Sequence, residues 1–313
     1  MRALPGTELL AQVLARPLPY SSRPMPLRDP ARDPGLFGPD SVTWRVMREP
    51  LLILGAGRAL LMQAANPLVA QGALDHSGFD RDPYGRLERT IEWVTLVSFG
   101  TTAEAGRASA QVNALHRRVV GRLPVAAATR RLGAGSRYSA SDLDLLRWVH
   151  ASFVDTMLVT HDALVGGLDD AERDAFVREW HAVAALMGVP RRLLWRDAAA
   201  MRAYVTRQVE RGPALPGAGS RLVGDTVLHP PVRSALMRPG MELLGFIAAG
   251  LLPDRVREGY AIPWTGAHAA AHRTIRVTLR TLGPALPRRL RISPIHDLAV
   301  ARARGRWPER AAA

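Results

Sequence analysis

Apolar residues recur every three to four positions along most of the chain after residue 40, which is the spacing of amphipathic helices. The most apolar pattern covers residues 58–74 and is interrupted by Asn66 and Pro67. A polar turn at residues 75–80 separates it from two further helical patterns, of which the second ends near Gly121. The stretch 58–121 therefore predicts three helical segments joined by polar turns, and the chain is organised around it.

Residues that cap helix starts support this interpretation and extend it along the chain. Three such motifs are present: Thr101-x-x-Glu104, Ser141-x-x-Asp144 and Asp169-x-x-Glu172. The first predicts a helix to about Val120, and the second a helix of about six turns that a glycine pair closes. Further helices are expected near residues 41–49, 197–211, 231–251 and 266–282, with loops at 212–219 and 284–291.

Eight of the 24 prolines fall in the first 40 residues, a density that opposes regular structure. The chain has no internal repeat and no convincing run of strands. It therefore predicts an all-α fold: a proline-rich N-terminal arm over residues 1–40 and a single multi-helix domain over residues 41–313.

A glycine pair, Gly55 and Gly57, follows a short apolar run at residues 51–54 and resembles the start of a dinucleotide-binding loop. The third glycine of that motif is replaced by Leu60, and no second strand follows at the required spacing. We therefore interpret Gly55 and Gly57 as glycines that allow a tight turn into the following helix.

Composition narrows the class of protein. Apolar residues make up 47% of 313 residues, enough for a sizeable core, and no run of about 18 apolar residues predicts a membrane-spanning helix. The N-terminus lacks the apolar segment of a signal peptide, so we expect a cytoplasmic location. With no cysteine, the chain cannot form disulfides, thiolate metal sites or iron–sulfur clusters.

The net charge of +14 raises nucleic-acid binding as a function. All 42 basic residues are arginines, and they are scattered and interleaved with acids rather than gathered in a stripe with aromatic residues. We expect no nucleic-acid partner.

Two of the nine histidines lie on apolar helix faces. His116 has Val112, Val119 and Val120 at helical spacings, and His150 is flanked in the same way by leucine, phenylalanine, valine and methionine. His161 follows His150 by eleven residues, roughly 16 Å along one helix, so these two cannot bind one iron. Each of these histidines could instead be a core residue that forms a buried hydrogen bond and binds no metal.

Sites with several protein ligands lack their motifs. No HExxH occurs, no glutamate precedes a histidine by three residues, and there is no GxSxG elbow. The dipeptides His161-Asp162 and His296-Asp297 are too short to be specific. Haem remains compatible, because one histidine suffices to hold its iron and an apolar pocket holds the macrocycle.

Three stretches together resemble the latex-clearing protein (rubber oxygenase) and mpaB-type oxygenase catalytic domain family. They are ANPLVAQGALDHSGFDRDPYGRLERTIEWVTLVSFG, ALHRRVVG and YSASDLDLLRWVHASFVDTMLVTHDALVGGLDDAERDAF. The resemblance covers residues 51–190 well and the rest thinly. It implies an all-α fold that binds haem b, and an oxidoreductase activity; studied members cleave isoprenoid double bonds with dioxygen.

Carried onto this chain, the resemblance makes His116 the proximal iron ligand and places Arg86 and Thr90 in the haem pocket. Arg89 stands where rubber-cleaving members have a lysine that can ligate iron, which a protonated guanidinium cannot do. Residues 58–74 also contain no glutamate, which those members use as a base. These departures leave haem binding in place and bring rubber cleavage itself into question.

The resemblance also implies roles for the surrounding residues. Arg86 and Arg89 would bind haem propionates or polarise dioxygen, and His76 or Thr90 would donate a hydrogen bond on the distal side. The catalytic candidates are thus His76, Arg86 and Thr90. His150 is the competing axial ligand, or forms a buried hydrogen bond near the pocket.

The expected partners are dioxygen and an apolar small molecule. Residues expected along its channel, or else simply in the core, are Leu61, Met62, Val69 and Phe79. The alternative function is a haem-binding protein without oxygenase activity, or a helical interaction module.

Overall fold

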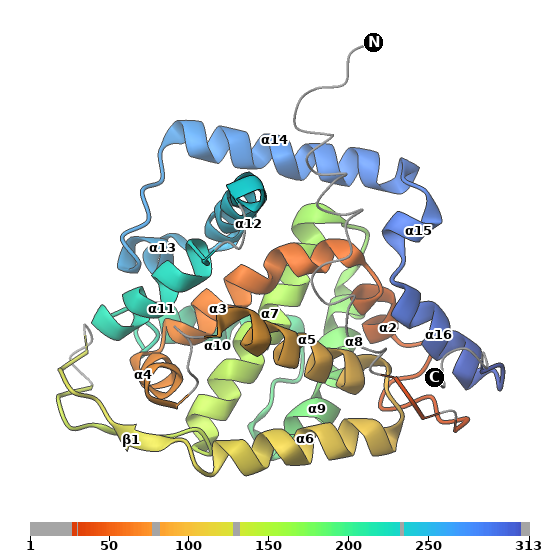
Figure 1. Ribbon diagram of the computed structural model, residues 1–313, viewed down its shortest axis with the longest axis horizontal. Helices are drawn as coiled ribbons and strands as arrows, with labels where there is room; N and C mark the ends of the chain where they lie inside the picture. Colours follow the sequence, from red (N-terminus) through yellow and green to blue (C-terminus); the bar gives the residue numbers. More distant parts are fainter. Residues whose placement is uncertain (1–26, 30, 77–81, 128–131, 232–234, 308–313) are drawn as a thin grey trace.

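A computed structural model describes residues 27–29, 31–76, 82–127, 132–231 and 235–307. Within them the protein is built almost entirely of helices, as Figure 1 shows. The predicted all-α class is confirmed. A small two-stranded antiparallel sheet, β1 (Val120–Arg122) with β2 (Arg137–Ser139), is the exception.

The longer helices follow one another along the chain. Their bounds are α3 (Ala56–Ala64), α4 (Pro67–His76), α5 (Pro83–Phe99), α6 (Thr102–His116), α7 (Leu143–Leu164), α8 (Asp170–Glu179), α10 (Ala198–Glu210), α11 (Ala218–Leu228), α12 (Arg238–Leu251), α14 (Gly266–Leu282) and α16 (Pro294–Ala303). Shorter helices are α2 (Val42–Met47), α9 (His181–Leu186), α13 (Asp254–Gly259) and α15 (Arg288–Arg291), with 3-10 turns at Pro50–Gly55, Arg191–Leu193, Ala235–Met237 and Gly283–Ala285.

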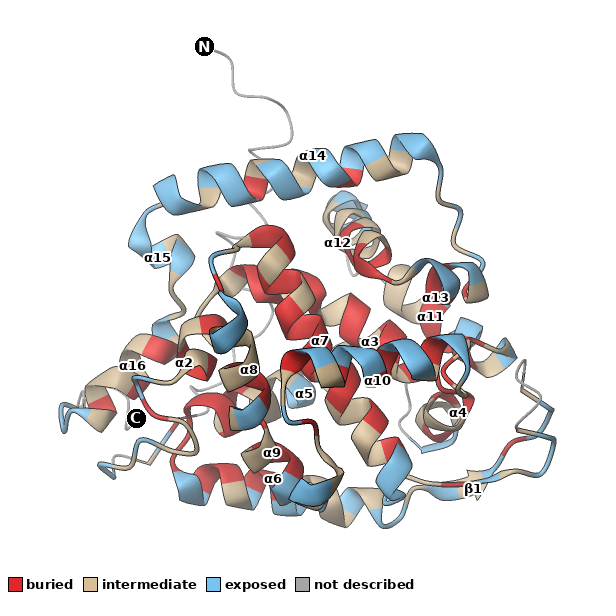
Figure 2. Ribbon diagram, turned by 180° about the vertical axis from the view of Figure 1, so that it is seen from behind, coloured by how far each residue is buried: buried red, intermediate tan, exposed pale blue. Residues whose placement is uncertain are grey.

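The centre of the fold is formed by α3 and α7, which are the most buried helices in Figure 2. Asp142 caps the start of α7, one residue after the serine expected in that role, and its carboxylate accepts from the amides of Asp144 and Leu145. The helix ends at a glycine pair, Gly166 and Gly167, whose φ angles of 79° and 85° suit glycine. The main core surrounds these two helices and includes Trp148, Met157 and Leu158 of α7.

The glycines before α3 serve helix packing. Residues Pro50–Gly55 form a 3-10 helix rather than a strand, so a dinucleotide-binding loop is not built here. A Cβ atom on Gly55 would lie 2.3 Å from Oγ1 of Thr160, and one on Gly57 would lie 2.8 Å from Cβ of Ala248. The two glycines therefore let α3 approach α7 and α12 closely.

The interruption at Asn66 and Pro67 is a sharp bend of 104° between Pro50–Ala64 and α4. The Asn66 side chain accepts a hydrogen bond from the Leu68 amide at 3.0 Å, and Pro67 occupies the first position of α4. Across the described residues, no single helix meets the length and apolarity needed to cross a bilayer.

Several helix bounds differ from the sequence-based expectation. The helix expected to reach Val120 ends at His116, because the β-branched Val119 and Val120 lead into β1, where Val120 pairs with Ser139. Val120 is 54% exposed and does not share a helix face with His116.

Other differences lie toward the C-terminus. The helix expected from 169 onward divides at Trp180 into α8 and α9, and the one expected from residue 231 begins only at Arg238. Helices α11, α13, α15 and α16 were not expected, since each is short or lacks a long apolar pattern. The expected loop at 284–291 was wrong in its second half, where α15 forms.

The described part of the N-terminal arm is packed on the domain. Leu27 is fully buried with Trp44 and Phe99, and the amides of Arg28 and Asp29 donate to Oε1 of Glu104. Residues 1–26 and 30 lie outside the described residues, so the remainder of the arm stays a prediction.

Candidate functional site

His116 is the last residue of α6 and is half-buried. The capping box of Thr101 and Glu104 fixes the start of this helix, as predicted. Burial lowers the pKa of His116, so its imidazole is neutral at pH 7. Its Nδ1 atom is buried and has no hydrogen-bond partner among the described residues.

These properties fit a haem ligand. A neutral imidazole has one nitrogen with a free lone pair, which is the group that binds haem iron. Leaving a buried polar atom unpaired costs roughly 1–3 kcal/mol. Nδ1 of His161 and Nε2 of His272 are unpaired in the same way, so it is the family motif that distinguishes His116 from them. His116 therefore has the protonation state that iron binding needs, together with an unexplained buried nitrogen.

Arg86 and Thr90 lie one turn apart near the start of α5. Asp82 caps this helix by accepting from the Gly85 amide, and the hydroxyl of Thr90 donates to the carbonyl oxygen of Arg86 at 3.0 Å. Arg86 is half-buried, and burial, followed by the nearby charge of Arg89, lowers its pKa. Thr90 is exposed. Both residues belong to α5 and are four positions apart, so they lie on the same side of this helix.

Arg89 has a different environment. Its side chain is 57% exposed and forms an ion pair with Asp82 at the start of its own helix, with 3.5 Å between Nη1 and Oδ2. A protonated side chain paired in this way is not an iron ligand. It remains close enough to Arg86 to affect that residue's pKa.

His76 lies at the end of α4 and is exposed, with Nε2 3.0 Å from the carbonyl oxygen of Val120. Its ring meets that of Tyr138 edge-on at 6.2 Å, and the Tyr138 hydroxyl donates to Asp75 at 2.5 Å. The end of α4 thus packs on the small sheet, whose first strand begins four residues after His116. The structure brings His76 and the end of α6 to the same corner of the fold, with α5 packed along α6.

His150 lies in a cluster of aromatic rings. Its ring is parallel to that of Trp195 at 6.4 Å and is also 6.4 Å from that of Trp180. Burial, with a smaller contribution from His181, lowers its pKa to about 3. We expected a buried hydrogen bond for His150, and the contacts that the structure describes are with rings instead.

The residues expected along the substrate channel are mostly core residues. Leu61 and Met62 are fully buried in the main cluster, and Val69 is half-buried against it. Leu61 and Met62 are therefore residues of the core, which was the alternative to a place along the channel. Phe79 lies outside the described residues.

A buried ion pair between two central helices is a feature that the sequence pattern did not predict. Arg58 of α3 is 2% exposed and forms an ion pair with Asp155 of α7, which is 4% exposed. Opposite charges on the buried faces of two apolar helices are the signal that would have revealed it. Elsewhere in the described residues, no group of three or more histidine, aspartate or glutamate side chains is arranged to hold a metal ion.

Comparison with known proteins adds independent evidence. Residues 44–281 match the family model described as ER-bound oxygenase mpaB/B'/Rubber oxygenase, catalytic domain. Two uncharacterized mycobacterial proteins, Mb2261 of Mycobacterium bovis and Rv2237 of Mycobacterium tuberculosis, are each 26% identical to this chain over 157 residues. These alignments cover 48% of the chain and 57% of each relative's length.

No solved structure matches the chain. The family model extends over about three quarters of the sequence and includes His76, Arg86, Thr90, His116 and His150. The chain belongs to the mpaB/rubber oxygenase catalytic domain family.

Proposed function

We propose that this protein is a haem b-dependent oxygenase that acts on an apolar substrate of the isoprenoid class with dioxygen. Membership of an oxygenase family supports the reaction class. The observation that carries the haem assignment is the buried, unpartnered Nδ1 of a neutral His116, in the motif that matches the family's proximal ligand.

His116 would hold the iron through one ring nitrogen, while the other nitrogen needs a partner to fix the tautomer. Arg86 has the charge and the partial burial to bind a propionate by a charge-assisted bond. Haem iron, when bound, supplies the activation of dioxygen that amino-acid side chains cannot provide.

The distal side differs from that expected of a rubber-cleaving enzyme. Arg89 pairs with Asp82, and residues 58–74 contain no glutamate to act as a base. Thr90 and His76 are the distal candidates; Thr90 donates to Arg86 and His76 contacts Val120. We therefore propose an apolar substrate other than polyisoprene.

The same observations favour a second candidate, a haem-binding protein without oxygenase activity. Both functions require haem, so the first test is titration of the full chain with haem and measurement of the Soret absorbance. A saturable band at one haem per chain is expected. Its absence would overturn both functions and leave a helical interaction module.

The second test separates the two haem proteins. Dioxygen consumption by the haem-loaded protein is measured with squalene dispersed in detergent, and the products are examined by mass spectrometry. The controls are the same protein with detergent alone and the His116→Ala variant with squalene. Carbonyl products that contain oxygen from labelled dioxygen are expected. Full haem loading without any such product would support the non-catalytic alternative.

A further inference from the structure

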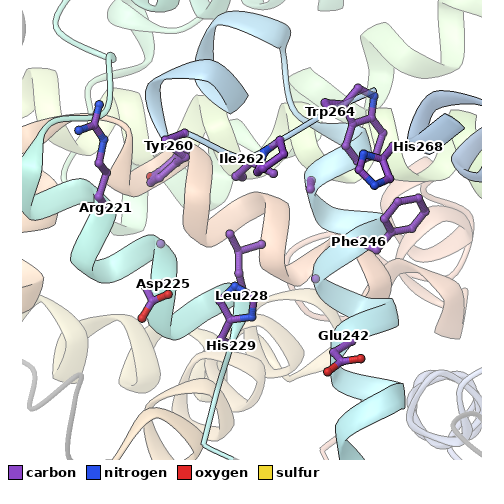
Figure 3. A pocket seen from close by; sticks show the side chains of 15 residues that line it. Arg221, Asp225, Leu228, His229, Glu242, Phe246, Tyr260, Ile262, Trp264 and His268 are labelled. Carbon is purple, nitrogen blue, oxygen red and sulfur yellow. The ribbon is translucent and has the colours of Figure 1, made fainter. Parts of the chain in front are cut away.

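A cavity of about 460 Å³ lies between α11 and α12, with residues 260–264 closing one side of it (Figure 3). The described residues that line it include none of the haem-site candidates. It is therefore a separate feature that the proposed oxygenase function leaves without a role.

One part of this cavity is apolar. Leu228, Phe246, Ile262 and Trp264 contribute to its wall. The rings of Phe246 and Trp264 are stacked at 5.3 Å, and the guanidinium of Arg257 lies 4.5 Å from the centre of the Trp264 ring. This packing fixes the aromatic wall, which suits the apolar body of a ligand.

The cavity is also held in a defined shape. The Tyr260 hydroxyl donates to the carbonyl oxygen of Leu61 at 2.6 Å, which ties the 260–264 segment to the central helix α3. A Cβ atom on Gly224 would lie 2.7 Å from the Tyr260 ring, so α11 meets this segment at a glycine. Because the cavity is preformed, the protein loses little conformational entropy when a ligand binds in it.

The other part of the cavity is acidic. Asp225 on α11 and Glu242 on α12 line it, and Figure 3 shows both carboxylates at the side away from Trp264. Both residues are exposed, and neither has an ion pair or a side-chain hydrogen bond within the described residues. Arg221, the one arginine among the lining residues, donates through Nε to the Gly259 carbonyl at 2.9 Å.

Counted over Arg221, Asp225 and Glu242, this lining has a formal charge of −1 in a chain of formal charge +14. We propose that the cavity binds a small organic cation with an apolar body. The apolar part lies against Phe246 and Trp264, and the cationic group lies by Asp225 and Glu242. The chemistry of such a ligand is that of an alkylammonium.

The test is isothermal titration calorimetry of the full chain with octyltrimethylammonium, tetramethylammonium and octyl sulfate, all below micelle-forming concentrations. Octyltrimethylammonium is expected to bind at one site and more tightly than the other two, since it alone has both the charge and the apolar body. Raising the salt concentration should weaken its binding.

The matched variant is the double substitution Asp225→Asn and Glu242→Gln, which keeps the shape of the cavity. It should bind octyltrimethylammonium roughly ten-fold more weakly and lose the preference over octyl sulfate. Glu258→Gln, which removes an exposed acid of α13 outside the lining, should bind like the natural protein. Equal binding of cation and sulfate, no binding, or an unaffected double variant would each overturn the proposal.

Discussion

The guanidinium of Arg58 and the carboxylate of Asp155 form an ion pair in the core, with 2.7 Å between Nη2 and Oδ2. Arg58 also donates through Nη1 to the Thr156 hydroxyl at 2.5 Å and through Nε to the Leu251 carbonyl at 2.8 Å. One side chain therefore connects α3 with α7 and α12, at the centre of the fold.

Because Arg58 cannot lose its proton, removal of its partner leaves an uncompensated buried charge. We expect Asp155→Ala to lower the free energy of unfolding by about 3–5 kcal/mol, measured by urea denaturation. The control is Asp144→Ala, whose side chain is 89% exposed and paired with Arg147 at 3.5 Å; it should cost less than about 1 kcal/mol. Similar losses for the two variants would show that the buried pair is not structural.

Ala261 has a φ angle of 56°, and no other described residue apart from glycine has a positive φ. It follows Tyr260, the C-cap of α13: its amide donates to the Glu258 carbonyl, and the Ile262 amide donates to the Arg257 carbonyl. Glycine is favoured in this left-handed position, so Ala261→Gly should raise the free energy of unfolding by about 0.5–1 kcal/mol.

Gly188 provides the opposite change as a control. It has a φ angle of 88°, and a Cβ atom there would meet nothing within 4 Å, so Gly188→Ala adds only backbone strain. It should lower the free energy of unfolding by about 1 kcal/mol in the same urea experiment. A destabilising Ala261→Gly would contradict the left-handed backbone conformation of residue 261.

Burial, together with Arg45, Arg173 and Arg48 and against the opposing charge of Asp162, lowers the pKa of His161 to about 4. In the unfolded chain this pKa is about 6.5, so between those values the unfolded state binds the proton and the native state does not. Stability contributed by neutral His161 is thus complete above about pH 6.5 and is lost as the pH falls toward 4. The loss is on the order of 3 kcal/mol.

The measurement is the free energy of unfolding from pH 4 to 7.5 for the natural protein and for His161→Leu, which cannot bind the proton. Other histidines contribute equally to the pH profiles of both proteins. The difference between the two profiles therefore reports the contribution of residue 161 alone. The variant should show the shallower dependence. Parallel profiles would mean that His161 titrates normally in the native state.

Local signals in the sequence predicted most of the helices. The capping boxes Thr101–Glu104 and Asp169–Glu172 are formed as expected, because each depends only on residues three positions apart. The ends of the helices were harder to predict. Helix α6 stops at His116 because Val120 pairs with Ser139 of β2, and the residues around Val120 do not by themselves encode that pairing.

The polar interior could not be predicted for the same reason. Arg58 and Asp155 are 97 positions apart, and His76 and Val120 are 44 apart, so their contacts depend on how helices pack. The inward position of His150 followed from its helical spacing. Its stacking on Trp195 did not, since that ring belongs to another segment.

Arg86 and Thr90 test the polar side of the proposed haem pocket. We expect Arg86→Ala to leave the protein folded but to release haem several-fold faster to apomyoglobin, because a half-buried cation for a propionate is lost. Thr90→Ala should have a smaller effect on haem retention. It should change the absorbance spectrum of the haem when a diatomic ligand is bound to the iron. Arg118→Ala, an exposed arginine two residues beyond His116, is the control. Unchanged retention and spectra in both variants would make Arg86 and Thr90 helix-surface residues only.

The most direct measurement compares His116→Ala with His150→Ala, each titrated with haem and examined by absorbance and electron paramagnetic resonance. His116→Ala should lose the native ligand field, and added imidazole should partly restore it by filling the vacated axial position. His150→Ala should keep that field, because its ring is stacked in the aromatic cluster, although its stability falls. Loss of the field in His150→Ala alone would move the iron ligand to His150, and an unchanged spectrum in both variants would contradict haem binding through either histidine.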